Sequence, residues 1–301
     1  IVRSSGSVYG VRTAAGAVVD CRVKGNFRLK GIRSTNPVAV GDNVKFDVRS
    51  DGTAYITEIL ERKNYIVRKA SNLSKQSHIL AANLDLCFLV VTISHPVTAT
   101  TFIDRFLAAA EAYRVPVVLV FNKVDLYNTT ECEELDYLTA LYESIGYKCL
   151  HTSAVGGHGV EQLRDTMQGK VSLLAGNSGV GKSSLVNAIA PEIAARVGEI
   201  SKTHDTGMHT TTYTEMFEFM PGSYIVDTPG VKGFGTYDME VEEISHYFVE
   251  FFELSKDCKY GNCTHTHEPG CAVKEAVENG EISYERYSSY LGMLDEEGKY
   301  R

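Results

Sequence analysis

Residues 176–183 read Gly-Asn-Ser-Gly-Val-Gly-Lys-Ser, which is the spacing of a phosphate-binding loop. Glycines at these positions let backbone N–H groups turn toward phosphate oxygens, and the N-terminus of a following helix adds partial positive charge. We expect Lys182 to reach the β- and γ-phosphates of a nucleotide and Ser183 to place its hydroxyl on Mg²⁺. The residues expected to contact the nucleotide here are Gly176, Asn177, Ser178, Gly179, Val180, Gly181, Lys182, Ser183 and Ser184.

The alternative for this stretch is a glycine-rich turn that contains Lys-Ser by chance. A phosphate-binding loop requires a strand before it and a helix after it, and the sequence predicts both. Residues 170–175 have the length and apolar composition of a buried strand, and residues 184–189 open a helix. The flanking pattern therefore favours a nucleotide-binding loop.

Two further polar segments each follow a predicted strand. Residues 122–125 read Asn-Lys-Val-Asp after an apolar stretch at 115–121, and Thr-Ser-Ala at 152–154 follows a short strand at 147–151. The Asp125 carboxylate can accept hydrogen bonds from guanine N1–H and its exocyclic amine, a pair of donors that adenine lacks.

The other residues of these segments complete the prediction. We expect Lys123 to lie along the base and Asn122 to brace the neighbouring loop. A backbone N–H of Ser153 or Ala154 is expected at guanine O6. Asn122-Lys123 alone could be a polar turn, but with the phosphate loop these segments predict a guanine-nucleotide site at the ends of parallel strands.

A long polar segment follows the helix of the phosphate loop. Residues 197–212 are irregular and end in His-Thr-Thr-Thr, and a long loop inside a compact domain is usually functional or disordered. It lies where a GTPase places the threonine that completes Mg²⁺ coordination; we assign Thr211, although the residues leave open which threonine binds. Asp227 follows a strand at 223–226 and suits an outer-shell Mg²⁺ carboxylate, with a turn cap as the alternative, and the Gly230 N–H suits the γ-phosphate.

Three cysteines and a histidine lie close together near the C-terminus, at Cys258, Cys263, His265 and Cys271. They match a closed tetrahedral Zn²⁺ site whose four ligands all come from the protein, so we expect a structural metal. Free buried cysteines and His267 in place of His265 are the two alternatives. The chain has seven cysteines and no secretory features, so a disulfide framework is not expected and a reducing cytosol fits.

The elements that must position these residues alternate between strand and helix from about residue 70. Apolar stretches at 84–92 and 115–121 predict buried strands, and apolar residues at helical spacing predict helices at 101–113 and 131–145. This rhythm predicts an α/β fold with a doubly wound, mostly parallel sheet. Further strands are expected at 213–219 and 223–226, and helices at 240–254, 272–279 and 284–294.

The first part of the chain differs in charge and in pattern. Residues 1–75 carry 14 Lys and Arg against 6 Asp and Glu, a net charge of +8 in a chain of net charge −8. Short strands separated by turns suit a Greek-key barrel of the OB type, which binds nucleic acid on one strand face; a merely solvated basic face is the alternative. The expected strands are residues 6–12, 16–23, 27–29, 43–49 and 54–60, and the cations around Phe27 are Arg22, Lys24, Arg28, Lys30 and Arg33.

The order of the nucleotide-binding motifs is unusual. In ordinary small GTPases the guanine-specific segments follow the phosphate loop, whereas here they precede it and Asp227 comes last. The sheet and the site survive such a change if the chain is circularly permuted. The expected fold is a circularly permuted P-loop GTPase domain at 69–235, preceded by a small OB-type β-barrel at 1–68 and followed by a helical zinc-binding domain at 236–301.

With this domain order, the phosphate-loop sequence, His-Thr-Thr-Thr and the cysteine spacing, the chain resembles the ribosome small-subunit-dependent GTPase A family. The resemblance covers essentially the whole chain. It implies an enzyme that uses GTP with Mg²⁺, carries one structural Zn²⁺, binds the small ribosomal subunit late in maturation and leaves as GDP forms. It also implies that the barrel and the zinc domain contact ribosomal RNA. We expect a cytoplasmic monomer with no membrane partner.

The resemblance also assigns a catalytic histidine. Val231 follows Gly230 where Ras-like enzymes carry a water-orienting Gln, and a valine cannot hold a water by hydrogen bonding. In the family a histidine of the switch segment takes this role, and the matching position is His209, with a loop-ordering histidine as the alternative. Met208 stands where the family usually has Arg or Lys, which removes one cation from a phosphate or RNA contact. The expected catalytic residues are His209, Lys182 and Thr211.

Two other classes of function compete with a GTP hydrolase. The first is an RNA-binding module in which GTP is only a structural ligand; strong stimulation of hydrolysis by ribosomal subunits would exclude it. The second is a small-molecule kinase built on the same loop. The Asn-Lys-Val-Asp segment argues against a kinase, and no arginine-rich lid follows Ser183.

Overall fold

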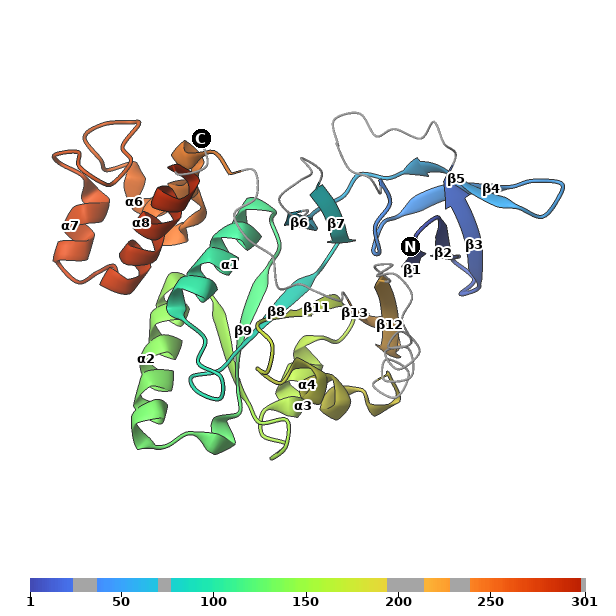
Figure 1. The fold of residues 1–301 in the computed structure, drawn as a ribbon, viewed down its shortest axis with the longest axis horizontal. Coiled ribbons are helices and arrows are strands. Elements are labelled where there is room, and N and C mark those ends of the chain that lie inside the picture. The colour runs from blue at the N-terminus through green and yellow to red at the C-terminus, as the bar shows by residue number, and fades with distance from the viewer. Residues whose placement is uncertain (24–36, 70–76, 194–213, 228–238, 299–301) are drawn as a thin grey trace.

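The centre of the molecule is an eleven-stranded mixed sheet (Figure 1). The computed structural model describes residues 1–23, 37–69, 77–193, 214–227 and 239–298. The strand order of the sheet is β10-β9-β8-β11-β13-β12-β1-β2-β3-β5-β4. These strands are β1 (Arg3–Ser5), β2 (Val8–Arg12), β3 (Val18–Val23), β4 (Val44–Val48), β5 (Ala54–Ile59), β8 (Leu86–Val91), β9 (Val117–Asn122), β10 (Lys148–Thr152), β11 (Val171–Ala175), β12 (Thr214–Met220) and β13 (Ser223–Asp227).

Five neighbouring strands, from β10 to β13, are all parallel, and helices cover both of their faces. Because successive side chains of a strand point to opposite faces, Leu89 and Val91 pack in one core and Phe88 and Val90 in the other. The first core also contains residues of α1 (Thr100–Ala112) and α2 (Thr129–Ile145), and the second contains residues of α3 (Val160–Thr166) and α4 (Lys182–Ile189). The doubly wound, mostly parallel sheet predicted from the sequence is confirmed.

The structure shows how a permuted order still forms one site. β9 and β10 precede β11 in the chain, yet all three belong to the parallel part of the sheet, with β8 between β9 and β11. The carboxyl ends of parallel strands meet at one edge of a sheet, so the segments after β9, β10 and β11 lie at the same edge.

The N-terminal strands have the order β1-β2-β3-β5-β4 and continue the sheet beyond β12. The junction is the antiparallel pair β1–β12, in which Ser4 lies opposite Thr214. The expected strand at 6–12 is wrong at its start, because Gly6, with φ of 63°, lies in the turn between β1 and β2. The strand expected at 27–29 lies outside the described residues.

Several observed elements were not predicted, and the largest are a β-hairpin and a short helix. A hairpin of β6 (Tyr65–Lys69) and β7 (Ser77–Ala82) lies between the N-terminal strands and α1 (Figure 1). Its strands are separated by seven residues with no two-residue turn signal, so the pairing was not visible in the sequence. The second element is α3, whose two turns are too short to show a helical period.

The C-terminal part is helical and lies on the other side of the parallel sheet from β1–β5 (Figure 1). The single helix expected at 240–254 is wrong: a 3₁₀ helix, η3 (Val241–Tyr247), is followed by α6 (Val249–Ser255). Phe248 between them is extended, with φ of −98° and ψ of 104°, and its fully buried ring packs against Phe251 and Tyr290. Burial of this ring therefore overrides the helical pattern. The last helices are α7 (Ala272–Glu278) and α8 (Tyr284–Gly298).

Helices that could cross a membrane were sought among the described residues, and none is both long enough and apolar enough.

Candidate functional site

The phosphate loop leaves β11 and enters α4 in a conformation that needs glycine at two close approaches. A Cβ atom on Gly176, whose φ is 134°, would lie 2.2 Å from the carbonyl oxygen of Val90 in β8. A Cβ atom on Gly181, whose φ is 97°, would lie 2.3 Å from Nδ2 of Asn122. Both residues therefore let the loop pass against the ends of neighbouring strands.

The polar side chains of the loop lie at the start of α4. Lys182 is half-buried, and its Nζ donates to the carbonyl oxygens of Gly176 (2.8 Å) and Asn177 (2.6 Å). Ser183 and Ser184 are exposed in the first turn of the helix. Ser178 and Gly179 are also exposed, whereas Val180 is fully buried in the core beneath α3 and α4. The buried Val180 anchors the loop and leaves its cation and hydroxyls at the surface.

Asn122 joins the phosphate loop to the segments after β9 and β10. Its side chain is 1% exposed, and Nδ2 donates to the carbonyl oxygen of Val180 at 2.8 Å. Its Oδ1 accepts from Oγ1 of Thr152 at 3.0 Å. Both halves of the amide are thus used, which fixes its orientation and holds three loops together.

Lys123 makes a second connection. It adopts a left-handed backbone conformation with φ of 66°, and its Nζ donates to the carbonyl oxygens of Gly179 (2.6 Å) and His95 (2.5 Å). The aliphatic stem of Lys123 therefore crosses from the segment after β9 to the loop before α4. This position agrees with a side chain that could lie along a bound base.

Asp125 and the residues after β10 complete this edge of the sheet. Asp125 is exposed in the short 3₁₀ helix η1 (Val124–Leu126). Ser153 is buried; its backbone N–H donates to the carbonyl oxygen of His158 (2.9 Å), and its Oγ accepts from the N–H of Gly156 (2.8 Å). Ala154 is half-buried beside it. The backbone donor of Ser153 is therefore already used within the protein.

The sequence did not point to two residues that support this edge. The Tyr127 hydroxyl donates to the carbonyl oxygen of Asn122 (2.6 Å) and accepts from the N–H of Ile93 (2.9 Å), and burial raises the pKa of Tyr127 to about 12. The loop at 92–99, which presents His95, was also missed. It follows β8, so the rule that ligands bind at the carboxyl ends of parallel strands could have identified it.

The remaining predicted nucleotide contacts lie at or beyond the limits of the described chain. Asp227 is the last residue of β13, and its backbone lies opposite Glu215 of β12. His209, Thr211 and Gly230 lie outside the described residues, as does the whole polar segment at 197–212.

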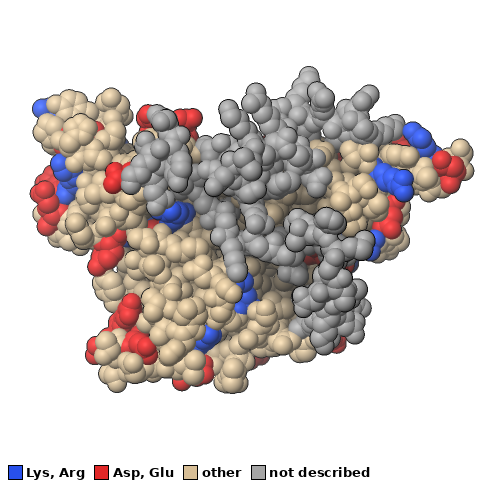
Figure 2. All heavy atoms as spheres, viewed as in Figure 1, with Lys and Arg blue, Asp and Glu red and all other residues tan. Residues whose placement is uncertain are grey.

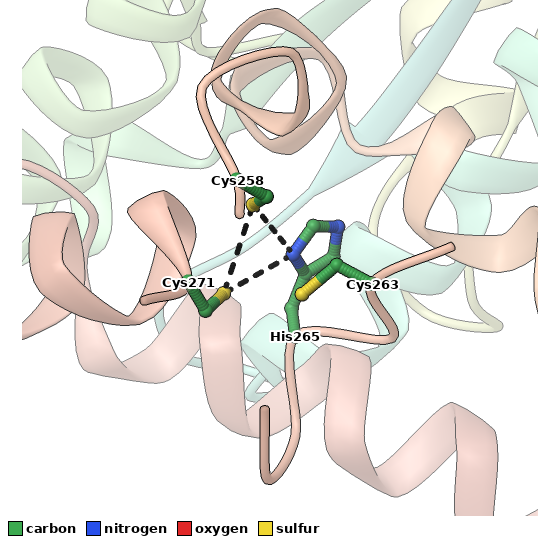
Figure 3. Close-up of side chains that lie close together, drawn as sticks. All are labelled: Cys258, Cys263, His265 and Cys271. Carbon is green, nitrogen blue, oxygen red and sulfur yellow. Dashed lines mark hydrogen bonds between the residues drawn. The ribbon is translucent and has the colours of Figure 1, made fainter. Parts of the chain in front are cut away.

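The predicted metal ligands come together in the C-terminal part (Figure 3). Sγ of Cys258 lies 3.9 Å from Sγ of Cys271 and 3.6 Å from Nδ1 of His265, and Nδ1 lies 3.3 Å from Sγ of Cys271. With Sγ of Cys263, the four donor atoms lie within 4.8 Å of one another. Donors at these separations can share one ion at the usual ligand distances of about 2.0–2.3 Å. The cluster can therefore hold a metal ion.

The choice between the two histidines follows from the same geometry. His265 is 1% exposed and faces the thiols, and burial lowers its pKa, which favours the neutral imidazole that metal ligation requires. His267 is exposed, and its Nδ1 lies 2.9 Å from Oγ1 of Thr266. Burial raises the pKa of Cys271, and that of Cys263 to about 12, so a bound cation would have to displace thiol protons.

Polar contacts from α8 and from one carboxylate hold the ligand loop. Tyr287 and Tyr290 donate to the carbonyl oxygens of His265 (2.7 Å) and Thr264 (2.6 Å). Glu268 accepts from the N–H and hydroxyl of Thr264 (2.8 and 2.6 Å). Burial acts to raise the pKa of Glu268, but these hydrogen bonds lower it well below its usual range. These hydrogen bonds therefore hold the loop in addition to the ligand cluster.

The predicted basic surface of the N-terminal part is only partly described. Arg22 is exposed on β3, and the other cations around Phe27 lie outside the described residues. In Figure 2, Lys and Arg are mixed with Asp and Glu at the end of the molecule that β4 and β5 occupy. Many described cations of this part are in ion pairs, which are Arg3–Asp20, Arg12–Glu218, Lys45–Glu58, Arg62–Asp42 and Lys63–Asp85.

Comparison with known proteins extends over the whole chain. Residues 59–237 match the family model described as RsgA GTPase, and residues 1–56 match the one described as RsgA N-terminal domain. The chain is 62% identical to the small ribosomal subunit biogenesis GTPase RsgA 2 of Bacteroides thetaiotaomicron, over 100% of this chain and 98% of that protein.

Two solved structures are similar to this one over nearly their full lengths. The crystal structure of YjeQ from Thermotoga maritima gives a TM-score of 0.77 at 36% identity, covering 98% of each chain. The structure of YloQ, described as a circularly permuted GTPase, gives a TM-score of 0.74 at 29% identity, covering 100% of this chain and 94% of the other.

Proposed function

This chain belongs to the RsgA GTPase family, and from that membership we propose that it binds GTP, hydrolyses it to GDP and phosphate, and acts in late maturation of the small ribosomal subunit. The observation that carries the nucleotide-binding part is the bond from Asn122 Nδ2 to the carbonyl oxygen of Val180 at 2.8 Å. It ties the predicted base-binding segment directly to the predicted phosphate loop, so one ligand can contact both.

Guanine is selected by the residues after β9 and β10. Asp125 is exposed beside Lys123, where its carboxylate can accept both donors on the guanine edge. The Ser153 N–H is used by the carbonyl oxygen of His158, so the contact to guanine O6 falls to the N–H of Ala154.

The phosphates occupy the loop between β11 and α4. Its backbone N–H groups and the N-terminus of α4 supply positive potential. When the nucleotide binds, Nζ of Lys182 exchanges the carbonyl oxygens of the loop for the β- and γ-phosphates. The exposed Ser183 hydroxyl, in the first turn of α4, is a hard oxygen donor that suits Mg²⁺, and the sequence assigns Thr211 and Asp227 as the other Mg²⁺ groups. The ion, when bound with GTP, neutralises charge that develops on the phosphate oxygens.

Water attack is assigned to the segment before β12. Val231 cannot orient a water, and His209 takes this part in our proposal, with Lys182 and Thr211 stabilising charge on the γ-phosphate.

The metal in the C-terminal cluster is proposed to be one structural Zn²⁺ held by Cys258, Cys263, His265 and Cys271. Three thiols and an imidazole are the donor set that Zn²⁺ prefers in closed sites. Hard cations such as Mg²⁺ prefer oxygen ligands, so the cluster does not suit the ion of the nucleotide site.

The proposed division of labour follows three segments. Residues 1–68 bind ribosomal RNA, residues 69–235 bind and hydrolyse GTP, and residues 236–301 form the zinc-binding domain that also contacts the ribosome. β6 crosses the boundary at 68 and 69, which makes the β6–β7 hairpin the joint between the first two. The protein is proposed to act in the cytoplasm as a monomer.

One experiment tests this function. Phosphate release from GTP is measured with and without purified small ribosomal subunits. We expect slow release by the free protein and a large increase with subunits, and we expect Lys182→Ala to remove both activities. If subunits bind the protein but leave hydrolysis unchanged, the chain is instead a GTP-dependent RNA-binding module without significant catalysis.

A further inference from the structure

Three charged side chains, one each from α1, α6 and α8, meet where α8 packs against α1. Nη1 of Arg286 donates to Oδ1 of Asp104 at 2.9 Å, and its Nε and Nη2 donate to the two carboxylate oxygens of Glu250 at 2.8 and 2.9 Å. The side chains of Arg286 and Asp104 are each 1% exposed, and that of Glu250 is 15% exposed. The guanidinium also lies over the Phe248 ring, 4.5 Å from its centroid.

Burying these three charged groups costs desolvation free energy, so the triad is not explained by stability alone. Burial acts to lower the pKa of Arg286, but its bonds to Glu250 and Asp104 raise it, so the cation is retained. Apolar side chains of similar volume often give equal or greater stability than a buried ion pair. Apolar side chains can pack in several arrangements. A planar guanidinium with three directed hydrogen bonds instead restricts the helices that it connects to one arrangement.

On one side, the triad continues to the metal cluster. Arg286 is followed on α8 by Tyr287 and, one turn later, by Tyr290. These two hydroxyls hold the carbonyl oxygens of His265 and Thr264 in the ligand loop. A movement of α8 therefore moves the ligand loop with it.

On the other side, the triad continues to the nucleotide site. Asp104 lies near the start of α1, and the loop at 92–99 leads directly into that helix. In this loop the carbonyl oxygen of His95 accepts from Lys123 Nζ, and a Cβ atom on Gly179 would lie 3.4 Å from Cδ of Pro96. The Thr92 hydroxyl donates to the carbonyl oxygen of Pro96, and the N–H of Thr92 donates to Oγ1 of Thr98. The N–H of Thr98 donates back to the carbonyl oxygen of Thr92, so the two ends of the loop are bonded to each other.

We propose that Arg286 is a positioning residue that couples the nucleotide site to the C-terminal metal-binding domain. By holding α1 in one register against α8, it makes the loop at 92–99 and the ligand loop parts of one unit. A nucleotide that orders Lys123 and the phosphate loop then also stabilises α8, and the effect is reciprocal because linkage between two binding equilibria always is. The inference rests on nucleotide binding in the proposed function and is independent of hydrolysis and of ribosome binding.

The test is amide hydrogen exchange of the full chain with and without GDP. In the parent protein, GDP is expected to slow exchange in α4, which follows the phosphate loop, and to slow exchange in α8 by about fivefold. The variant combines Asp104→Leu, Glu250→Gln and Arg286→Met, which removes all three charges together and avoids a stranded carboxylate. In this variant GDP should still protect α4 but should no longer protect α8.

Two controls make the result specific. Tyr137→Phe removes a different contact to α8, the exposed 3.3 Å hydrogen bond from the Tyr137 hydroxyl of α2 to Glu285, and should leave the protection of α8 by GDP unchanged. Arg286→Lys keeps the charge but loses the paired bonds to Glu250, so it should also uncouple α8 if the triple variant proves unstable.

The inference is overturned if α8 is protected equally in the parent and in both Arg286 variants, or if GDP protects α4 but not α8 in the parent. A parent protein in which GDP protects neither helix contradicts the nucleotide site itself, and the inference fails with it.

Discussion

Asn122 uses both ends of one amide to connect three loops. Its Nδ2 holds the Val180 carbonyl of the phosphate loop, and its Oδ1 accepts from Thr152 after β10. The backbone carbonyl of the same residue accepts from Tyr127. Since the side chain is buried, removing it would leave polar partners without water or protein to satisfy them. Asn122, together with Lys123, thus holds the segment after β9 against the loop before α4.

The base-reading role of Asp125 can be tested with Asp125→Asn. We expect GTP affinity to fall by about a hundredfold, because hydrogen bonds to a charged group contribute about 1.5–3 kcal/mol each. Affinity for xanthosine triphosphate should rise, since its C2 oxygen can accept from the new amide. Titration calorimetry with both nucleotides measures the change. Asp165→Asn, at an exposed carboxylate of α3, is the matched control, and unchanged GTP affinity in Asp125→Asn would remove the base-reading role.

The catalytic role of His209 belongs to the same scale. His209→Ala should keep GTP binding and subunit binding but lower the stimulated rate by about a hundredfold or more, which is typical for removal of a positioned acid–base group. Lys182→Ala should instead weaken nucleotide binding. Phosphate release at saturating subunits, together with GTP titration, separates the two effects. Full stimulation of His209→Ala would mean that another group holds the water.

At the scale of elements, α8 links parts that are far apart in the chain. It carries Arg286 toward α1 and places Tyr287 and Tyr290 on the metal-ligand loop. Phe251 of α6 packs edge-on against the His265 ring, with centroids 6.2 Å apart. The ligand loop is thus held by two helices as well as by its own ligands. We therefore expect loss of a bound metal to destabilise both helices.

Removal of one ligand should therefore unfold the C-terminal helices first. His265→Ala is expected to lose the bound zinc and the helical signal of α6 to α8, because a structural zinc ion contributes folding free energy directly. His267→Ala, at an exposed histidine two residues away, should keep one zinc ion per chain. Elemental analysis and circular dichroism measure the two properties. Zinc retained by His265→Ala but lost from His267→Ala would reverse the ligand assignment.

At the scale of the whole molecule, the parts on either side of the parallel sheet are joined in different ways. The N-terminal strands share backbone hydrogen bonds with the sheet through β1 and β12, supplemented by Arg12, which donates to Glu218 (2.6 Å) and to the Tyr224 hydroxyl (2.9 Å). The C-terminal helices are joined by side chains around Arg286. The first junction continues the sheet, whereas the second combines apolar packing of η3 and α8 on α1 with the charged contact of Arg286.

The Arg12 contact predicts a pH-dependent stability. The N–H of Gly222 and the Arg12 side chain lower the pKa of Glu218, so this carboxylate stabilises the fold above its unfolded pKa and loses that contribution as the pH falls through its folded pKa. Arg12→Met should lower the unfolding free energy by about 1 kcal/mol or less at neutral pH, since the pair is partly exposed. Urea denaturation at several pH values should show the difference shrinking in acid.

Lys45→Met is the control for this prediction, because Lys45 and Glu58 form an exposed pair within the N-terminal strands and away from the junction. If Arg12→Met and Lys45→Met change the unfolding free energy equally at every pH, the ion pair at the junction stabilises the protein no more than an ordinary surface pair.

The local elements and the residue types of the candidate sites could be predicted from the sequence. Apolar runs predicted β8 and β9, glycine spacing predicted the loop before α4, and cysteine spacing predicted the ligand cluster, because each depends on residues close together in the chain. The order of these motifs was enough to predict a permuted GTPase. The base and phosphate segments could be brought to one edge by the general rule for parallel strands.

Contacts between residues far apart in the chain could not be predicted in this way. The pairing of β1 with β12, the break at Phe248, the bond from Asn122 to Val180 and the Arg286 triad all join residues or faces that no local pattern relates. Their energies depend on burial, since a ring, an amide or a charge is held in one place only when the surrounding chain has excluded water from it. Sequence periodicity reports which face of an element is buried, but it does not report which partner that face will contact.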